Sequence, residues 1–494
     1  MSSMSSTSTS SILESSGARG PGRELALQIG LTGSIGMGKS TLASQFNNLG
    51  FPVFDADAAV HKMYSNGGSA VKPIEHAFPG VVVDGVVDRK ELGARVLSDS
   101  AAMALLEEIV HPLVQQDREV FLREMSELGH FLVIYDIPLL YEKPSTAPYV
   151  DYTIVASSDA DIQRQRVLNR PGMTTEKFES ILSKQMSDEK KRKLADYVIN
   201  TNSDHLAPAK SQIAKVLESI IEKQPDRWNI WKSRHPDRIT DAKTDLINIR
   251  DAFDAVVFDL DDTLCPVMGP VMGAVELLDE LIHEKMPLTK KNLGDEYKNK
   301  LREAMMRISK EEPMISHDLT TVRTRAFHEV VHDTEREQIE ILMNQFIAKR
   351  SDVENHLYDD VIPCFEWLAG QGIKIGVLTN GNANLTDSSI SRYFSQELII
   401  GAPEVGAMKP SPVGFISVLQ RGNFVPRRVL YVGDSFDKDV LGSMNVGMVG
   451  AIISREGVEG IPIENESEQG SKYIALSSLD PAEMEQKILS FLAR

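Results

Sequence analysis

The sequence predicts a two-domain α/β protein with a parallel sheet in each domain, and three observations support this. At 494 residues the chain exceeds the size of one ordinary hydrophobic core. Short runs that are apolar on both faces alternate with helix-length segments, which is typical of buried parallel strands joined by crossover helices. One charged, proline-containing stretch, residues 224–250, interrupts this alternation and is expected to link the domains.

The first domain is expected to span residues 25–223 and the second residues 251–494. Residues 1–24 are Ser-rich, cannot form a core, and are expected to be disordered. Trp228 and Trp231 in the linker indicate that it docks on a domain. The apolar runs predict strands at residues 27–32, 52–55, 131–136, 153–156, 255–259, 374–379 and 429–432.

Composition excludes several classes of protein. The net charge of -18, most of it after residue 225, argues against general nucleic-acid binding, which needs basic surface. Two cysteines rule out a disulfide framework and favour a reducing compartment. No apolar run approaches the ~20 residues that cross a bilayer. We therefore expect a cytoplasmic protein without a membrane partner, although the Ser-rich start leaves an organelle transit peptide open.

The first candidate site is a glycine-rich loop that follows strand 27–32 and precedes an expected helix. Its pattern G-x-x-x-x-G-K-S lets backbone N–H groups converge on phosphate oxygens at a helix N-terminus. Lys39 would neutralise β/γ-phosphate charge and the Ser40 hydroxyl would bind Mg²⁺. A nucleoside triphosphate is therefore expected on the following residues: Gly33, Ser34, Ile35, Gly36, Met37, Gly38, Lys39, Ser40 and Thr41.

Acidic and basic side chains are expected beside this loop. Asp55 and Asp57 end one strand and Asp136 ends another, at the sheet edge where α/β proteins bind ligands. A carboxylate there can orient or deprotonate an acceptor hydroxyl, although Asp55 can equally cap the next helix. Arg166 and Arg170 lie in a basic helical segment that is either a solvated face or a lid over the transferring phosphate.

Together these residues resemble the dephospho-CoA kinase family over about residues 25–223. The motifs are GLTGSIGMGKST, DAD at 55–57, HPL at 111–113, D-x-PLL-x-E at 136–142, and Gln185 ahead of ADYVINT at 195–201. The resemblance implies an adenylate-kinase-like sheet with a lid, and ATP-dependent phosphorylation of the ribose 3′-hydroxyl of dephospho-CoA. Carried over, Asp57 faces the acceptor hydroxyl, with Asp55 the second choice. Ser34 stands where many members have Gly.

The second candidate site begins with Asp259 and Asp261, directly after a hydrophobic strand. At a strand end, one carboxylate can attack phosphorus while the other carries a proton to the leaving group. Such a concentration of negative charge favours a cation, and Mg²⁺ prefers oxygen ligands. Taken alone, the stretch could also be a helix cap or a surface turn.

Three later stretches complete a pattern. One strand ends in Thr379, Lys409 follows in GAMKP, and another strand ends in Asp434 with Asp439 five residues on. This order resembles the four motifs of the haloacid-dehalogenase superfamily over about residues 254–494. The resemblance implies a Rossmann-like core with an inserted helical cap at about 266–370, and an aspartyl-phosphate at Asp259 with Asp261 as acid and base. It places Mg²⁺ on Asp259, the Asp261 main chain and Asp434, with Asp439 nearby.

The leading interpretation is a dephospho-CoA kinase joined to a magnesium-dependent phosphomonoesterase, using ATP, Mg²⁺ and small-molecule substrates. Two alternatives remain open. The second domain can be a regulatory or scaffold module without turnover, and the kinase can act on a different nucleoside or nucleotide.

Overall fold

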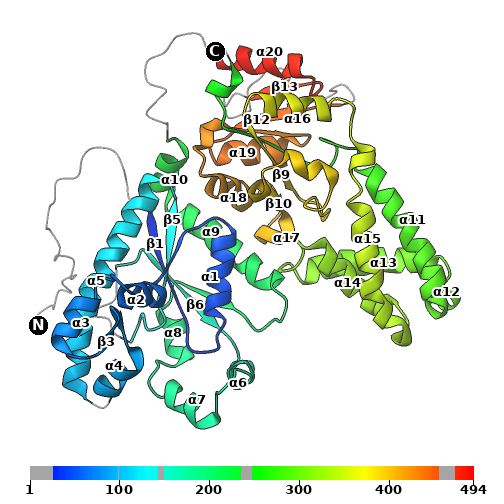
Figure 1. Ribbon diagram of the computed structural model, residues 1–494. Helices are drawn as coiled ribbons and strands as arrows, with labels where there is room; N and C mark the ends of the chain where they lie inside the picture. The colour runs from blue at the N-terminus through cyan, green and yellow to red at the C-terminus, as the bar shows by residue number, and fades with distance from the viewer. Residues whose placement is uncertain (1–25, 98, 143–148, 235–247, 456–472, 494) are drawn as a thin grey trace, which may run out of the picture.

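The computed structural model describes residues 26–97, 99–142, 149–234, 248–455 and 473–493. It contains two α/β domains with a cluster of helices beside the second sheet (Figure 1). The predicted disordered tail, residues 1–24, and residues 235–247 of the predicted linker lie outside the described residues. In the described part of the chain, no helix is both long and apolar enough to cross a membrane.

The N-terminal domain is built on a five-stranded parallel sheet in the order β2-β5-β1-β6-β7. The central strands are almost wholly buried because helices cover both faces, which explains their continuous apolar sequence. The last strand was not predicted, because the prediction used runs that are apolar on both faces and this strand exposes Val198 and Asn200 on one face. The strands are β1 (Leu27–Thr32), β2 (Val53–Asp55), β5 (Leu132–Asp136), β6 (Tyr152–Ser157) and β7 (Tyr197–Asn200).

Helices connect these strands, and a short antiparallel hairpin, β3 (Val82–Val83) with β4 (Val86–Val87), lies between two of them. The first helix starts at Lys39, directly behind the glycine-rich loop. The helices are α1 (Lys39–Asn48), α2 (Ala56–Tyr64), α3 (Val71–Ala77), α4 (Arg89–Val96), α5 (Ser100–Glu127), α6 (Ala160–Leu168), α7 (Thr175–Leu182), α8 (Asp188–Leu194), α9 (Ala207–Lys223) and α10 (Pro225–Lys232).

The C-terminal domain has a six-stranded parallel sheet in the order β10-β9-β8-β11-β12-β13. The two parallel sheets confirm the predicted fold class. The strands are β8 (Ala255–Phe258), β9 (Lys374–Thr379), β10 (Ile399–Gly401), β11 (Val429–Gly433), β12 (Val449–Ile453) and β13 (Ile474–Leu476). The helices outside the insertion are α16 (Val361–Gly370), α17 (Ala402–Val405), α18 (Pro412–Gly422), α19 (Gly442–Asn445) and α20 (Pro481–Leu492).

Five helices inserted after β8 form a separate hydrophobic cluster, which we call the cap. They are α11 (Met268–Lys285), α12 (Pro287–Leu293), α13 (Glu296–Glu311), α14 (Leu319–Val330) and α15 (Ile339–Arg350). The cap was predicted to extend to about residue 370. In the structure it ends at α15, because Val361, Phe365 and Leu368 of α16 pack in the sheet's own core.

The two domains share one hydrophobic core across their boundary. The apolar face of α9 packs against α17 and α18 of the second domain, so buried residues of both domains belong to a single cluster (Figure 1). Two glycines allow this close approach. A Cβ on Gly406 would lie 2.4 Å from the Lys210 carbonyl, and one on Gly447 would lie 2.3 Å from the Lys232 carbonyl oxygen. Both glycines have φ above +80°, which other residues rarely adopt.

The described part of the predicted linker is helical and packed. In α10 the rings of Trp228 and Trp231 stack with centroids 5.0 Å apart, and Phe131 meets Trp228 edge-on. Trp231 donates its indole N–H to the Gly129 carbonyl at 2.9 Å. The tryptophans therefore fix this segment on the first domain. A separate hydrogen bond crosses the domain boundary, where Ser411 donates to the Glu218 carboxylate at 2.6 Å.

The cap also contains a buried histidine, His317, whose two ring nitrogens have no hydrogen-bond partner in the described structure. Burial lowers the pKa of His317 to about 4 from its ordinary 6.5. The folded state therefore binds this proton less readily than the unfolded state, and stability should fall as the pH drops from 6.5 toward 4. At pH 5.5 we expect a cost of about 1 kcal/mol.

His317→Phe should remove this acid sensitivity. Between pH 7 and pH 5.5, the variant's melting temperature should fall less than that of the unaltered protein. Equal falls would show that His317 does not titrate in this way.

Candidate active sites

The glycine-rich loop forms a cradle between β1 and the N-terminus of α1. Its left-handed residues, Gly36 and Gly38, have φ of 78° and 84°. A Cβ on Gly36 would lie 2.4 Å from Val167, so a larger residue would push the loop away from α6. The cavity in front of the loop has a volume of about 390 Å³ and is lined by all nine predicted loop residues, Gly33–Thr41.

Charged side chains meet beside this cradle. The Lys39 ammonium pairs with the carboxylate of Asp136. Burial raises the pKa of Asp136, the Lys39 partner opposes that shift, and the nearby charges of Asp55 and Asp57 add to it. Three carboxylates and one lysine therefore lie at the carboxyl edge of the sheet, as predicted from the strand ends.

Asp55 and Asp57 differ in position although they are two residues apart. Asp55 is the N-cap of α2, where its side chain accepts a hydrogen bond from the Ala58 N–H at 2.9 Å. Asp55 lines neither the cradle nor the second, larger cavity beside it. Asp57, in the first turn of α2, lines both of them.

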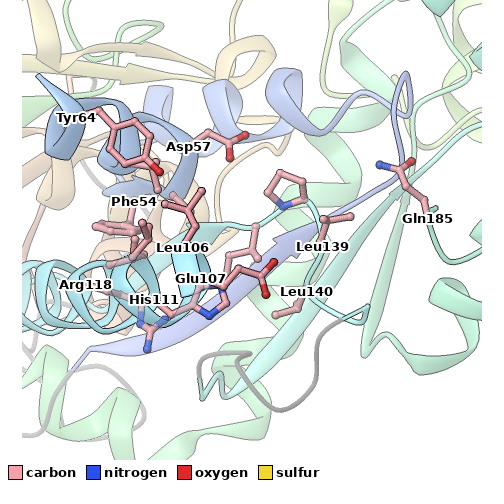
Figure 2. Close-up of a pocket in the computed structure, with 16 residues that line it drawn as sticks. Phe54, Asp57, Tyr64, Leu106, Glu107, His111, Arg118, Leu139, Leu140 and Gln185 are labelled. Carbon is pink, nitrogen blue, oxygen red and sulfur yellow. The ribbon is translucent and has the colours of Figure 1, made fainter. Parts of the chain in front are cut away.

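The second cavity lies on the other side of Asp57 and has a volume of about 560 Å³. Figure 2 shows the apolar side chains of Phe54, Tyr64 and Leu106 toward one end of it and Gln185 at the other. Polar side chains of α5 also line it: Glu107, His111 and Arg118. Asp57, Pro138 and Gln185 border both cavities, so the two are adjacent.

The two arginines of the basic segment have different surroundings. Arg170 lines the cradle. Arg166 does not line the cradle, because its guanidinium donates to the Thr201 carbonyl at 2.6 Å. Thr201 in turn donates its hydroxyl to the Met37 carbonyl of the loop at 2.9 Å. Arg166 thus supports the loop from behind instead of facing the cradle as predicted.

Gln185, quoted only as part of a motif, contacts the loop directly. Its side-chain oxygen accepts a hydrogen bond from the Ile35 N–H at 3.0 Å. Gln163 donates to the Ile35 carbonyl at 2.7 Å. These contacts had no signal in the sequence, since neither glutamine is near the loop along the chain.

In the C-terminal domain, the ends of β8, β9 and β11 meet around a cavity of about 180 Å³. Lys409 lines this cavity and is 6% exposed. Its ammonium donates to Asp259 at 2.6 Å, to Asp439 at 2.7 Å and to the Tyr431 hydroxyl at 2.9 Å. Burial raises the pKa of Asp259, and the Lys409 charge opposes this shift.

Three carboxylates in this cavity can hold a metal ion. Asp259, Asp434 and Asp439 each offer an oxygen atom, and these atoms lie within 4.8 Å of one another. Both oxygens of Asp439 already accept hydrogen bonds, one from Lys409 and one from the Ser435 N–H at 3.0 Å. Asp259 and Asp434 therefore keep the freer oxygens. An all-oxygen donor set of this kind fits Mg²⁺.

The remaining predicted residues also border the cavity. The Thr379 hydroxyl accepts a hydrogen bond from the Gly381 N–H at 2.9 Å. Asp261 lines the cavity and accepts a hydrogen bond from Arg350 at 2.5 Å. The structure thus brings together Asp259, Asp261, Thr379, Lys409, Asp434 and Asp439.

Sequence reasoning did not single out two residues of this site, Tyr431 and Arg350, and it assigned the Asn380 amide, beside Thr379, to a phosphoryl oxygen. Tyr431 was treated as an ordinary strand residue, but its hydroxyl accepts from Lys409 and donates to the Leu378 carbonyl at 2.9 Å. Asn380 fixes the Lys409 main chain through hydrogen bonds to its N–H and its carbonyl. Arg350 comes from the cap, about ninety residues from Asp261 along the chain. Only the three-dimensional fold brings Arg350 to the site.

Comparisons with known proteins match both domains. A family model described as dephospho-CoA kinase matches residues 27–207, and one described as haloacid dehalogenase-like hydrolase matches residues 253–447. Dephospho-CoA kinase of Mesorhizobium japonicum is 50% identical over 192 residues, which are 39% of this chain and 95% of that protein. Dephospho-CoA kinase of Novosphingobium aromaticivorans is 50% identical over 197 residues, which are 40% of this chain and 96% of that protein.

Among solved structures, 2-haloacid dehalogenase from Pseudomonas syringae is 25% identical to this chain. The match covers 49% of this chain and 99% of that protein, with a TM-score of 0.41.

Proposed function

The chain belongs to the dephospho-CoA kinase family through its first domain, and on that premise we propose that this domain transfers the γ-phosphoryl group of ATP to the ribose 3′-hydroxyl of dephospho-CoA. The observation that carries the proposal is the position of Asp57 between two adjoining cavities, one of them the phosphate-binding cradle. A phosphotransferase needs such a pair, because donor and acceptor must meet at one reacting centre.

The backbone, charged and hydroxyl groups of the cradle take separate parts in this reaction. The loop N–H groups and the N-terminus of α1 bind the phosphates, and Lys39 offsets charge on the transferring group. In the structure Lys39 pairs with Asp136, so triphosphate binding exchanges one anionic partner for another. The Ser40 hydroxyl would hold Mg²⁺, which shields the phosphate charge when bound. Arg170 reaches the same cavity from the segment after α6.

The larger cavity is the proposed acceptor site. Its apolar end has the size and character to bury part of a nucleotide-sized molecule, and Arg118 and His111 can contact phosphate or ribose oxygens. Asp57 accepts the proton of the attacking hydroxyl as the O–P bond forms. A different nucleoside or nucleotide acceptor is the competing possibility. Competition between dephospho-CoA and other nucleotides for ATP-dependent phosphorylation distinguishes the two.

The two neighbouring aspartates provide a matched test of this mechanism. Asp57→Asn should lower kcat for CoA formation by about 10²-fold, because the acceptor hydroxyl loses its proton acceptor. Asp55→Asn should have a much smaller effect, since Asn is also a good N-cap for α2. Steady-state rates of CoA formation, measured by mass spectrometry, check both. A larger loss in Asp55→Asn would assign the proton-accepting role to Asp55.

We also propose that the second domain is a phosphomonoesterase acting through an aspartyl-phosphate. The supporting observation is the convergence of Asp259, Asp261, Thr379, Lys409 and Asp434 on one small cavity. Asp259 attacks phosphorus, and Asp261 gives a proton to the leaving alcohol and later takes one from water. Thr379 and Lys409 bind the phosphoryl oxygens. Asp259 and Asp434 would hold Mg²⁺, which neutralises phosphate charge when bound.

A further inference from the structure

Two arginines of the cap, Arg350 and Arg323, lie at the edge of the C-terminal site. A carboxylate of that site balances the positive charge of only one of them. Arg350 ends α15 and is 3% exposed. One of its terminal nitrogens donates to Asp261 at 2.5 Å. The other terminal nitrogen is buried and has no hydrogen-bond partner in the described structure.

Arg323 lies on α14 and has still fewer partners. Its guanidinium lies over the Phe346 ring, 4.1 Å from the ring centroid. One terminal nitrogen is buried without a hydrogen-bond partner, and the charge that acts on Arg323 among the described residues is that of Arg350, not that of a carboxylate. Burial and then the neighbouring charge of Arg350 lower the pKa of Arg323 to about 10, so it remains protonated at neutral pH.

Neither arginine lines the phosphoryl cavity itself, but Arg350 contacts residues of the cavity wall and Arg323 lies close to Arg350. One turn before Arg323 on the same face of α14, the Thr320 hydroxyl accepts a hydrogen bond from the Asn382 side chain at 3.1 Å. Asn382 follows Gly381 of the cavity wall. A Cβ on Gly381 would lie 3.2 Å from the Thr379 hydroxyl and 3.4 Å from an Arg350 nitrogen. Arg350 therefore lies directly behind Asp261 and Gly381 of the cavity wall, and Arg323 is its charged neighbour on the cap side.

Two neighbouring, largely buried positive charges are unfavourable unless anions compensate them. Asp261 compensates one of them. The second charge lacks an acidic partner in the described protein, and the unpartnered guanidinium nitrogens are suited to a planar or tetrahedral oxyanion.

We infer that Arg323 and Arg350 bind a second anionic group on the substrate, so that the preferred phosphomonoester carries a carboxylate or another phosphate on its leaving alcohol. The inference rests on the proposed phosphatase function. It names the substrate class for this site, a doubly anionic small phosphoester, and assigns two cap residues to its recognition.

The test uses the full-length protein with Mg²⁺ and without ATP. Phosphate release from 2-phosphoglycolate is compared with release from 2-hydroxyethyl phosphate, which replaces the carboxylate by a neutral hydroxymethyl group. We expect kcat/KM to favour the charged ester by about 10- to 100-fold. The value of kcat/KM for propane-1,3-diyl bisphosphate in the same assay shows whether the site prefers a second phosphate or a carboxylate as the second anionic group.

Arg323→Met keeps much of the packing against Phe346 and removes the charge, so the preference for the charged ester should fall to about 1. Arg323→Lys should retain part of it, because a positive charge remains. Arg325→Met is the matched control on the same helix, since Arg325 points away to pair with Glu312, and the preference should persist. A preference that survives in Arg323→Met overturns the assignment.

Binding of stable analogues separates this inference from the proposed function. Calorimetry with 3-phosphonopropionate and with 3-hydroxypropylphosphonate should show about tenfold tighter binding of the charged analogue, lost in Arg323→Met. If no ester is hydrolysed but this difference remains, the phosphatase function fails and the anion site stands. Equal binding of the two analogues to the unaltered protein overturns the anion site, whatever the turnover.

Discussion

Lys39→Ala should lower the rate of CoA formation from ATP and dephospho-CoA by about 10³-fold. Lys39 is the positive side chain that the loop places at the phosphate cradle, and Asp136 holds it there in the absence of nucleotide. Without it, negative charge on the transferring phosphoryl group loses its main protein-borne compensation. Mass spectrometry of the product, at saturating ATP, measures the loss. Normal turnover in this variant would contradict the mechanism.

Two controls make the result specific. Lys39→Ala also leaves the partly buried Asp136 without its partner, so the melting temperature must be measured alongside activity. Lys39→Arg keeps a positive charge beside Asp136 and should recover part of the rate if charge compensation is the cause. Phosphate release by the second domain should persist in both variants, which shows that the chain is folded.

Asp259→Asn should reduce phosphomonoester hydrolysis by at least about 10⁴-fold, because an amide cannot form the aspartyl-phosphate. The fold should tolerate this change. Burial raises the pKa of Asp259, so its ionised form is costly in the folded chain, and Lys409 keeps Asp439 as a partner. Phosphate release from p-nitrophenyl phosphate, together with the melting temperature, checks both expectations.

The same variant tests whether the second domain is catalytic at all. Activity that persists in Asp259→Asn comes from a contaminating enzyme. If the unaltered protein hydrolyses no phosphoester, the domain is a regulatory or scaffold module that retains the site's residues. CoA formation should continue in Asp259→Asn under either outcome, since Asp259 lies in the other domain.

Much of both sites followed from short-range sequence patterns. The P-loop glycines, Lys39 and the strand-end aspartates lie where they were predicted, because parallel strands bring their carboxyl ends to one edge. Residues whose role depends on contacts with distant parts of the chain were misplaced or missed. Arg166 was expected to face the transferring phosphate, but its contact with Thr201 holds it behind the loop.

The cap illustrates the same limit at the level of elements. Its helical pattern continues into α16, so periodicity alone cannot show that α16 belongs to the sheet's core. Nothing in the sequence distinguishes Arg350 and Arg323 from the many other charged residues of the cap. Only the packing of α14 and α15 against each other and against the β9 loop brings them to the second site.

The shared core at the domain boundary affects how the protein can be divided. The apolar faces of α9 and α18 are buried against each other, and Gly406 and Gly447 lie in backbone contact with the first domain. A chain cut within residues 235–247 would expose these faces in both fragments, an aggregation hazard for each half expressed alone. Mixing the purified fragments should then restore a soluble complex, in the manner of a split protein.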